Sequence, residues 1–167
     1  MKKFMIMMAA ILGFAASANA QSDSNMAAGL NFNVGVGNSY TNMGIGGKFQ
    51  YKFAERWRGE ASFNYFFKKD YVDMWDANLD VHFLIPVGDK LVVYPIAGPT
   101  LRGATATVSF MGYSSTASST SFGVNYGAGV EYPLTDAIKV NFEMKGVTAG
   151  SGWGTRGVFS IGAAYCF

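Results

Sequence analysis

The chain has 167 residues, and only 14% of them are charged, against about 25% in typical soluble proteins. Without Lys2 and Lys3, which belong to the N-terminal segment discussed next, 11 basic residues face 11 acidic ones. This balance argues against a nucleic-acid partner, because phosphates favour a basic surface. The single cysteine, Cys166, excludes an intramolecular disulfide.

Residues 1–20 predict a cleaved secretory signal. Lys2 and Lys3 form a short positive start, residues 4–14 are a nearly continuous apolar run, and residues 17–20 supply the small residues of a cleavage site. The apolar run is too short to cross a hydrocarbon core of about 30 Å as a helix. The mature protein is therefore expected to be one domain over residues 21–167.

Beyond the signal, apolar residues recur at every second position, which is typical of strands with two unlike faces. Leu30, Phe32 and Val34, for example, alternate with asparagines. Pro95 and Pro99 predict a kink or bulge in one segment, because proline cannot donate to a ladder. The eight expected strands cover residues 28–36, 43–53, 57–67, 75–85, 91–102, 122–132, 138–145 and 159–167.

The connections between these segments alternate in kind. Residues 54–56, 86–90 and 135–136 are short turns, whereas residues 103–120 and 146–155 are longer and rich in Gly, Ser and Thr. Outer-membrane barrels have short periplasmic turns and longer external loops. The pattern predicts an all-β fold, a closed antiparallel eight-stranded transmembrane β-barrel with periplasmic N- and C-termini.

The alternation alone leaves two barrels open, because a soluble ligand-binding barrel has its apolar face inside and a membrane barrel has it outside. The polar face is rich in glycine and asparagine, which suits the crowded interior of a narrow barrel better than a solvated surface. The apolar face carries Trp57, Trp75 and Tyr132 near strand ends, as in an interfacial girdle. Both observations favour the membrane barrel.

The C-terminal residues carry the most specific resemblance. Gly162, Tyr165 and Phe167 look like the signal read by the barrel-assembly machinery, although Ile161 stands where that pattern prefers a polar residue. Residues 122–136 are similar to the penultimate hairpin of porin-family barrels. The mature chain thus resembles the small OmpX/OmpA-like outer-membrane barrels of the porin family.

This resemblance implies a monomer in the outer membrane of a Gram-negative bacterium. Its implied partners are outer-membrane lipids and, during biogenesis, periplasmic chaperones and the barrel-assembly machinery. The resemblance does not by itself give an activity.

Charged residues on the inward face must be paired, because an unpaired buried charge costs several kcal/mol. Strand neighbours suggest Lys48 or Lys52 with Glu60, and Glu131 with Lys139. Such a network either plugs the lumen and fixes the register or lines a gated ion path, and the narrow lumen favours the plug. The candidates are Lys48, Lys52, Arg58, Glu60, Asp76, Asp80, Glu131, Lys139 and Glu143, with Arg102, Lys145 and Arg156 as further cations.

His82 is the only histidine, and an interior hydrogen-bonded role is favoured for it. A catalytic alternative would join His82 to Asp80 and Ser62, but no Gly-x-Ser-x-Gly turn is present. Neither metal-ligand spacing nor a phosphate-binding glycine motif occurs. We therefore expect no catalytic, cofactor-binding or metal residues, and no cofactor.

The 103–120 segment is the remaining candidate for function. Residues 105–110 are rich in β-forming residues. The neighbouring strands either continue outward as a protruding hairpin, whose edge binds an extracellular ligand by strand addition, or give way to a flexible loop. The expected role is structural or in surface interaction, with a small pore for ions or solutes as the alternative and a lipid-acting enzyme as the third choice.

Overall fold

The computed structural model describes residues 25–37, 41–69, 71–110, 113–150 and 152–167. The predicted signal at residues 1–20 lies outside the described residues. Among those residues, no helix is long and apolar enough to span a membrane. The strands are β1 (Met26–Val36), β2 (Thr41–Ala54), β3 (Trp57–Lys69), β4 (Val72–Phe83), β5 (Ile85–Val87), β6 (Leu91–Phe110), β7 (Tyr113–Pro133), β8 (Ile138–Ala149) and β9 (Thr155–Cys166).

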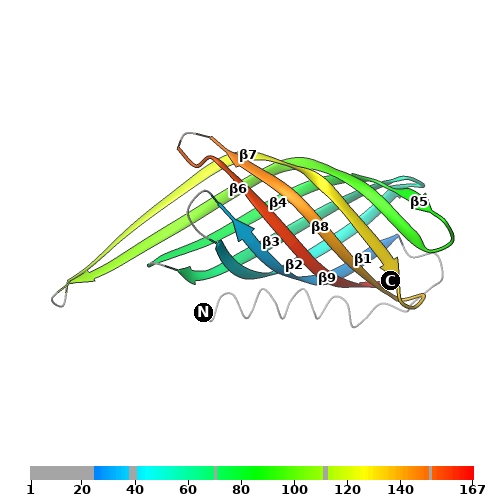
Figure 1. The fold of residues 1–167 in the computed structure, drawn as a ribbon, viewed down its shortest axis with the longest axis horizontal. Helices are drawn as coiled ribbons and strands as arrows, with labels where there is room; N and C mark the ends of the chain where they lie inside the picture. The colour runs from blue at the N-terminus through cyan, green and yellow to red at the C-terminus, as the bar shows by residue number, and fades with distance from the viewer. Residues whose placement is uncertain (1–24, 38–40, 70, 111–112, 151) are drawn as a thin grey trace.

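Every pairing in the sheet is antiparallel, and the sheet closes on itself. The strand order is β4-β3-β2-β1-β9-β8-β7-β6-β5, and β4 also pairs with β6. β4 and β5 follow one another along the same neighbouring strand, β6. Together they therefore occupy one of the eight strand positions of the barrel. β1 and β9 pair from Ala27↔Cys166 to Val36↔Gly157. The prediction of a closed antiparallel eight-stranded barrel is confirmed (Figure 1).

The alternation in the sequence sets the two faces. Asn31, Asn33 and Asn64 are buried inside the barrel, whereas Leu30 and Phe32 are exposed on its outer surface. Outward aromatic rings pair with one another: Trp57 lies 4.9 Å from Phe83, and Phe63 stacks on Trp75 at 5.9 Å between centroids. The core of the molecule is therefore polar and its surface apolar.

The two ends of the barrel differ. The end that carries Met26 and Cys166, here called the terminus end, has short turns. At the opposite end, here called the hairpin end, β6 and β7 run on together from Gly103↔Thr120 to Phe110↔Tyr113. β4 accompanies β6 only as far as Ala106, and β8 joins β7 only from Gly123. The hairpin alternative for residues 103–120 is therefore correct, and the hairpin protrudes from the barrel (Figure 1).

Two details differ from the sequence-based expectation. The expected loop at residues 146–155 is shorter, because β8 continues to Ala149 and β9 begins at Thr155. The expected bulge at the prolines is not found within β6, where Pro95 and Pro99 stay in register with β7. Instead, the β4–β6 ladder is interrupted between Asn78↔Thr100 and Val81↔Ala97, beside Pro99. The register shifts lie in β2–β3 near Lys52 and in β3–β4 near Phe66.

Candidate functional site

The lumen is filled by charged and amide side chains that the inward positions of the strands supply. Seven of the nine predicted network residues are buried: Lys48, Arg58, Glu60, Asp76, Asp80, Glu131 and Glu143. Lys139 is half-buried and Lys52 is exposed. Lys52 is in register with the buried Arg58 and lines a hollow at the terminus end of the lumen, where its side chain remains exposed.

At the terminus end, Glu131 on β7 joins two cations. Arg58 Nη1 donates to Glu131 Oε2 at 2.6 Å, and Lys139 Nζ lies 3.6 Å from the same oxygen. Charge-assisted bonds of this kind are the strong ones among protein hydrogen bonds. A small hollow of about 240 Å³ lies beside them and is also lined by Gln50, Lys52 and Cys166. The lumen is therefore indented from the terminus end.

A stack of three side chains crosses the lumen above this hollow. The Tyr94 ring is fully buried, stacks on the His82 ring at 4.8 Å, and has the Arg58 guanidinium 4.7 Å from its centroid. Arg58 also donates to Nδ1 of His82. Tyr94 pairs directly with Gly129 on β7, where an added Cβ would lie 2.5 Å from the ring. Gly129 thus leaves the room that the tyrosine ring occupies.

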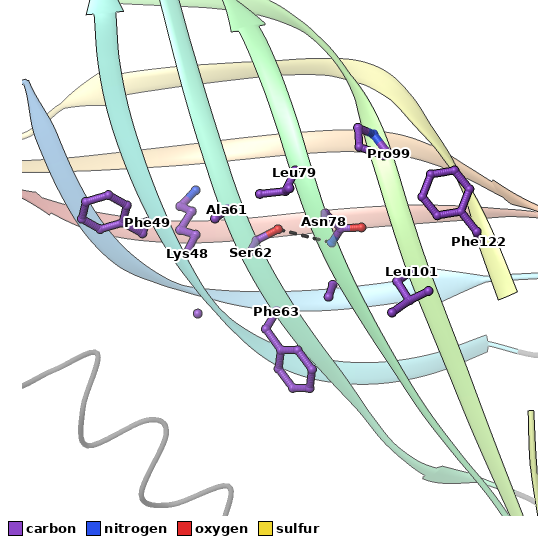
Figure 2. A pocket seen from close by; sticks show the side chains of 12 residues that line it. Lys48, Phe49, Ala61, Ser62, Phe63, Asn78, Leu79, Pro99, Leu101 and Phe122 are labelled. Atoms are coloured by element: carbon purple, nitrogen blue, oxygen red, sulfur yellow. Dashed lines mark hydrogen bonds between the residues drawn. The ribbon is translucent and has the colours of Figure 1, made fainter. Parts of the chain in front are cut away.

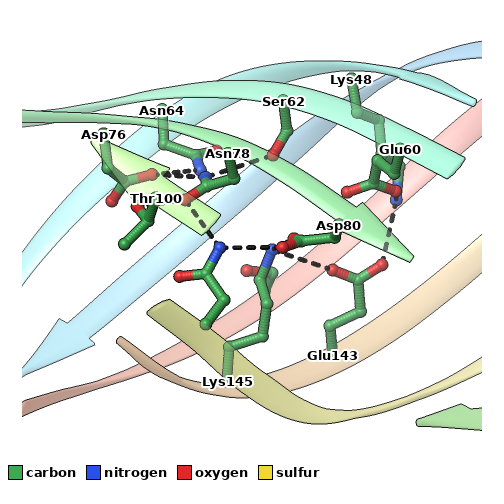
Figure 3. A network of polar contacts seen from close by, with 12 residues as sticks. Lys48, Glu60, Ser62, Asn64, Asp76, Asn78, Asp80, Thr100, Glu143 and Lys145 are labelled. Carbon is green, nitrogen blue, oxygen red and sulfur yellow. Dashed lines mark hydrogen bonds and ion pairs between the residues drawn. The ribbon is translucent and has the colours of Figure 1, made fainter. Parts of the chain in front are cut away.

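The middle of the lumen is an ion-pair network (Figure 3). Lys48 Nζ lies 3.4 Å from Glu143 Oε1 and 3.9 Å from Glu60 Oε2. Lys145 Nζ lies 3.2 Å from Asp80 Oδ2 and 3.7 Å from Glu143 Oε2. The hydroxyl of Tyr94 donates to Glu143 at 2.9 Å. Each charge is paired with an opposite one, which offsets the cost of removing it from water.

Towards the hairpin end, most of the lumen contacts are hydrogen bonds of asparagine side chains rather than ion pairs of lysines. Asn125 Nδ2 donates to Asn78 and Asp80, and Thr100 donates to Asn78 at 2.6 Å. Arg156 Nη2 donates to Asp76 Oδ2 at 2.8 Å. Asp76 lies on β4 and Arg156 on β9, and these two strands are not neighbours in the sheet. This ion pair therefore also spans the lumen.

An apolar layer lies in the lumen towards the hairpin end. Phe66, Val147 and Val158 are buried against one another, with Met74 packed on them. The Arg156 guanidinium lies 3.9 Å from the centre of the Phe66 ring, which ties this apolar layer to the polar network below it. The apolar layer therefore occupies the lumen beside the polar side chains Arg102 and Arg156.

Glu60, Asp80 and His82 are the described residues closest to a metal site, with one ligand atom of each within 4.8 Å of the others. Three cations lie beside the cluster, because Arg58 donates to His82, Lys145 pairs with Asp80 and Lys48 pairs with Glu60. A further cation would be repelled by them. The arrangement therefore suits an internal network rather than metal binding.

Of the predicted assembly signal, Gly162 and Tyr165 lie on the closing strand β9, and Phe167 directly follows it. Gly162 faces inward opposite Asn31, and an added Cβ would overlap the Asn31 side chain. The Phe167 amide donates to the carbonyl of Met26 at 2.9 Å, and its ring lies 6.5 Å from that of Phe49. The C-terminus is therefore joined to the first strand, β1.

These features define a class of protein: a small, closed antiparallel barrel with an apolar outer surface and a lumen filled by its own polar side chains. The sequence model of one protein family, the outer membrane protein beta-barrel domain, matches residues 6–167. The chain belongs to this family. No curated protein sequence matches the chain.

Solved structures share the fold at low sequence identity. The N-terminal β-barrel domain of Pseudomonas aeruginosa OprF is 19% identical, with a TM-score of 0.63 over 86% of this chain and 98% of that one. Ail, the attachment invasion locus protein of Yersinia pestis, is 19% identical, with a TM-score of 0.58 over 86% and 97%. Neisserial surface protein A is 15% identical, with a TM-score of 0.65 over 85% and 96%.

Proposed function

We propose that this protein is an integral outer-membrane barrel of a Gram-negative bacterium with a structural or surface-interaction role and a closed lumen. The observation that carries the proposal is the filled interior, in which paired charges occupy the middle and Phe66, Val147 and Val158 cover one end. An eight-stranded barrel is wide enough only for its own side chains. The scaffold therefore acts through what it presents outside.

The membrane location rests on the family and on the outer surface. Exposed Leu30, Phe32, Phe49 and Phe142 on that surface would be unfavourable in water. Aromatic pairs lie towards both ends, with Trp57–Phe83 at the terminus end and Tyr65–Phe67 at the other, as expected of interfacial girdles. In this arrangement residues 1–20 direct export, the termini face the periplasm, and chaperones and the barrel-assembly machinery deliver the chain.

The hairpin of β6 and β7 is the surface that we assign to partner binding. Between Ser114 and Thr120, β7 pairs with β6 on one side and has no β8 ladder on the other. An open strand edge of this length can accept an extended segment of another protein through backbone hydrogen bonds. Residues 103–121 contain no lysine or arginine. A polyanion such as the heparin analogue seen bound to Ail is therefore not the expected ligand of this edge.

A pore for ions or small solutes is the second candidate, favoured by the polar hollow at the terminus end. Planar-bilayer recording separates the two. We expect the folded protein to insert without reproducible single-channel steps. Stable steps that vanish when the protein is omitted would establish the pore and overturn the closed lumen.

Membrane insertion itself is tested by gel migration of the purified protein in detergent. A folded barrel resists the detergent until it is boiled, so boiled and unboiled samples should migrate differently. Identical migration, together with failure to associate with lipid vesicles, would count against the membrane barrel.

A further inference from the structure

A trough runs along the outer surface of the barrel over β3. Its floor is formed by two small outward residues, Gly59 and Ala61. The register places Tyr51 and Val81 on either side of Gly59, and Phe49 and Leu79 on either side of Ala61. Large side chains on β2 and β4 thus wall a floor that has almost no side chain of its own.

The trough continues towards the hairpin end, and Figure 2 shows the side chains that line this part. There Ala77 on β4 continues the floor, and Phe63, Leu101 and Phe122 surround it. This part encloses about 490 Å³, the part over Gly59 encloses about 330 Å³, and Phe49, Ala61 and Leu79 line both. The two parts therefore form one continuous depression.

Both ends of the floor on β3 are closed by paired aromatic rings. At one end Trp57 packs against Phe83, with 4.9 Å between the ring centroids. At the other end Phe63 stacks on Trp75 at 5.9 Å. Trp57 and Phe63 therefore flank the floor that Gly59 and Ala61 form along β3.

Gly59 is not needed for packing within the barrel. At the inward glycines Gly98 and Gly127, an added Cβ would overlap the backbone of the neighbouring strand. At Gly59 the nearest atom would be a Phe53 ring carbon at 3.9 Å. A glycine weakens a strand interior and often marks a place where another molecule approaches closely.

We propose that the trough binds one acyl chain of a membrane lipid. The polar residues at its rim turn inward: Lys48 Nζ bonds to Asn141, and Asn78 bonds to Ser62 inside the lumen. The walls therefore offer only dispersion contacts. An unbranched acyl chain matches a narrow apolar groove, and it fills a space that would otherwise leave the rings without contacts.

A second copy of the protein fits the trough less well. A stable protein interface buries about 800 Å² on each partner, which is far wider than a groove with a floor one strand across. The outer surface of a like barrel is also convex. The acyl-chain proposal rests on the proposed membrane location, because only a bilayer supplies this ligand.

Native mass spectrometry of the full-length protein tests the proposal. The protein is released from detergent micelles that contain dimyristoyl phosphatidylglycerol, and the retained lipids are counted. Ala61→Leu fills the floor of the trough on β3, and Ala77→Leu fills the larger part towards the hairpin end. Ala128→Leu is the matched control, because Ala128 is an exposed outward alanine on β7 away from the trough. Boiled and unboiled gel samples show which variants are folded.

We expect the natural protein and Ala128→Leu to retain one lipid, and the folded trough variants to retain it about tenfold less often at equal lipid concentration. Equal retention by all folded proteins would overturn the acyl-chain site while leaving the membrane barrel intact. Loss of the gel shift and of vesicle association in the natural protein would instead contradict the proposed function. A dimer of the natural protein that the folded Ala61→Leu and Ala77→Leu variants no longer form would instead assign the trough to a second copy of the protein.

Discussion

The guanidinium of Arg58 and the carboxylate of Glu131 meet across the lumen, with Nη1 and Oε2 2.6 Å apart, although β3 and β7 are not neighbours in the sheet. Lys145 on β8 reaches Asp80 on β4 in the same way. Such ion pairs join strands that share no backbone hydrogen bonds. The pairs therefore add contacts across the lumen to those of the backbone ladders.

Replacing Arg58 by alanine is expected to lower the free energy of unfolding by about 3 kcal/mol, because Glu131 would keep only the more distant Lys139 as a partner in a buried site. Urea titration in lipid vesicles measures the change. Lys52→Ala is the control, and as an exposed side chain it should change stability by less than about 0.5 kcal/mol. Equal effects of the two variants would show that the lumen pair contributes nothing.

Two glycine-to-alanine changes are expected to have opposite signs. Gly129→Ala should destabilise the barrel by about 1–3 kcal/mol, since the new methyl group would displace the Tyr94 ring. Gly59→Ala has room for its methyl group and should stabilise by about 0.5 kcal/mol through the lower backbone entropy of the unfolded chain. Urea midpoints of the two variants, measured side by side, test this; a stable Gly129→Ala protein would mean that Tyr94 can move freely.

The hairpin is expected to be dispensable for the barrel. Ala106 and Ala117 pair directly, and β4 leaves β6 at Ala106. Replacing residues 107–116 by an Asn-Gly turn should therefore leave the unfolding free energy within about 0.5 kcal/mol of the natural value. A partner captured by the natural protein should no longer bind. A large loss of stability would instead make the hairpin part of the barrel's own folding unit.

Deletion of Phe167 is expected to reduce assembly in the outer membrane severalfold. The residue directly follows the closing strand β9, and its amide donates to the carbonyl of Met26. Phe142→Ala is the matched control, because it also removes one outward aromatic ring but from a different strand. Because the assembly machinery is absent in vitro, refolding into vesicles should suffer much less than assembly in cells. Undiminished assembly would show that Phe167 is not part of the recognition signal.

The sequence predicted the architecture well because a period of two carries that information directly. Asn31, Asn33 and Asn64 turn inward, and Leu30 and Phe32 turn outward, as their alternation indicates. Neighbouring strands also allowed the proximity of Lys48 to Glu60 to be inferred before the structure was known. Local pattern and strand order are sufficient for both.

Contacts across the lumen could not be predicted in the same way, because they depend on the tilt and stagger of the closed sheet. Arg156 was a candidate cation, but its pairing with Asp76 appears only in three dimensions. Tyr94 was missed because apolar residues of both parities surround it near Pro95. The one available signal was Gly129, an inward glycine on the strand that pairs with β6.

In the closed lumen that we propose, the apolar layer of Phe66, Val147 and Val158 leaves a single opening, at the terminus end. A solute that enters from the terminus end can only leave by the same opening. On this proposal, the number of copies in a cell can rise or fall without altering what leaks through the envelope.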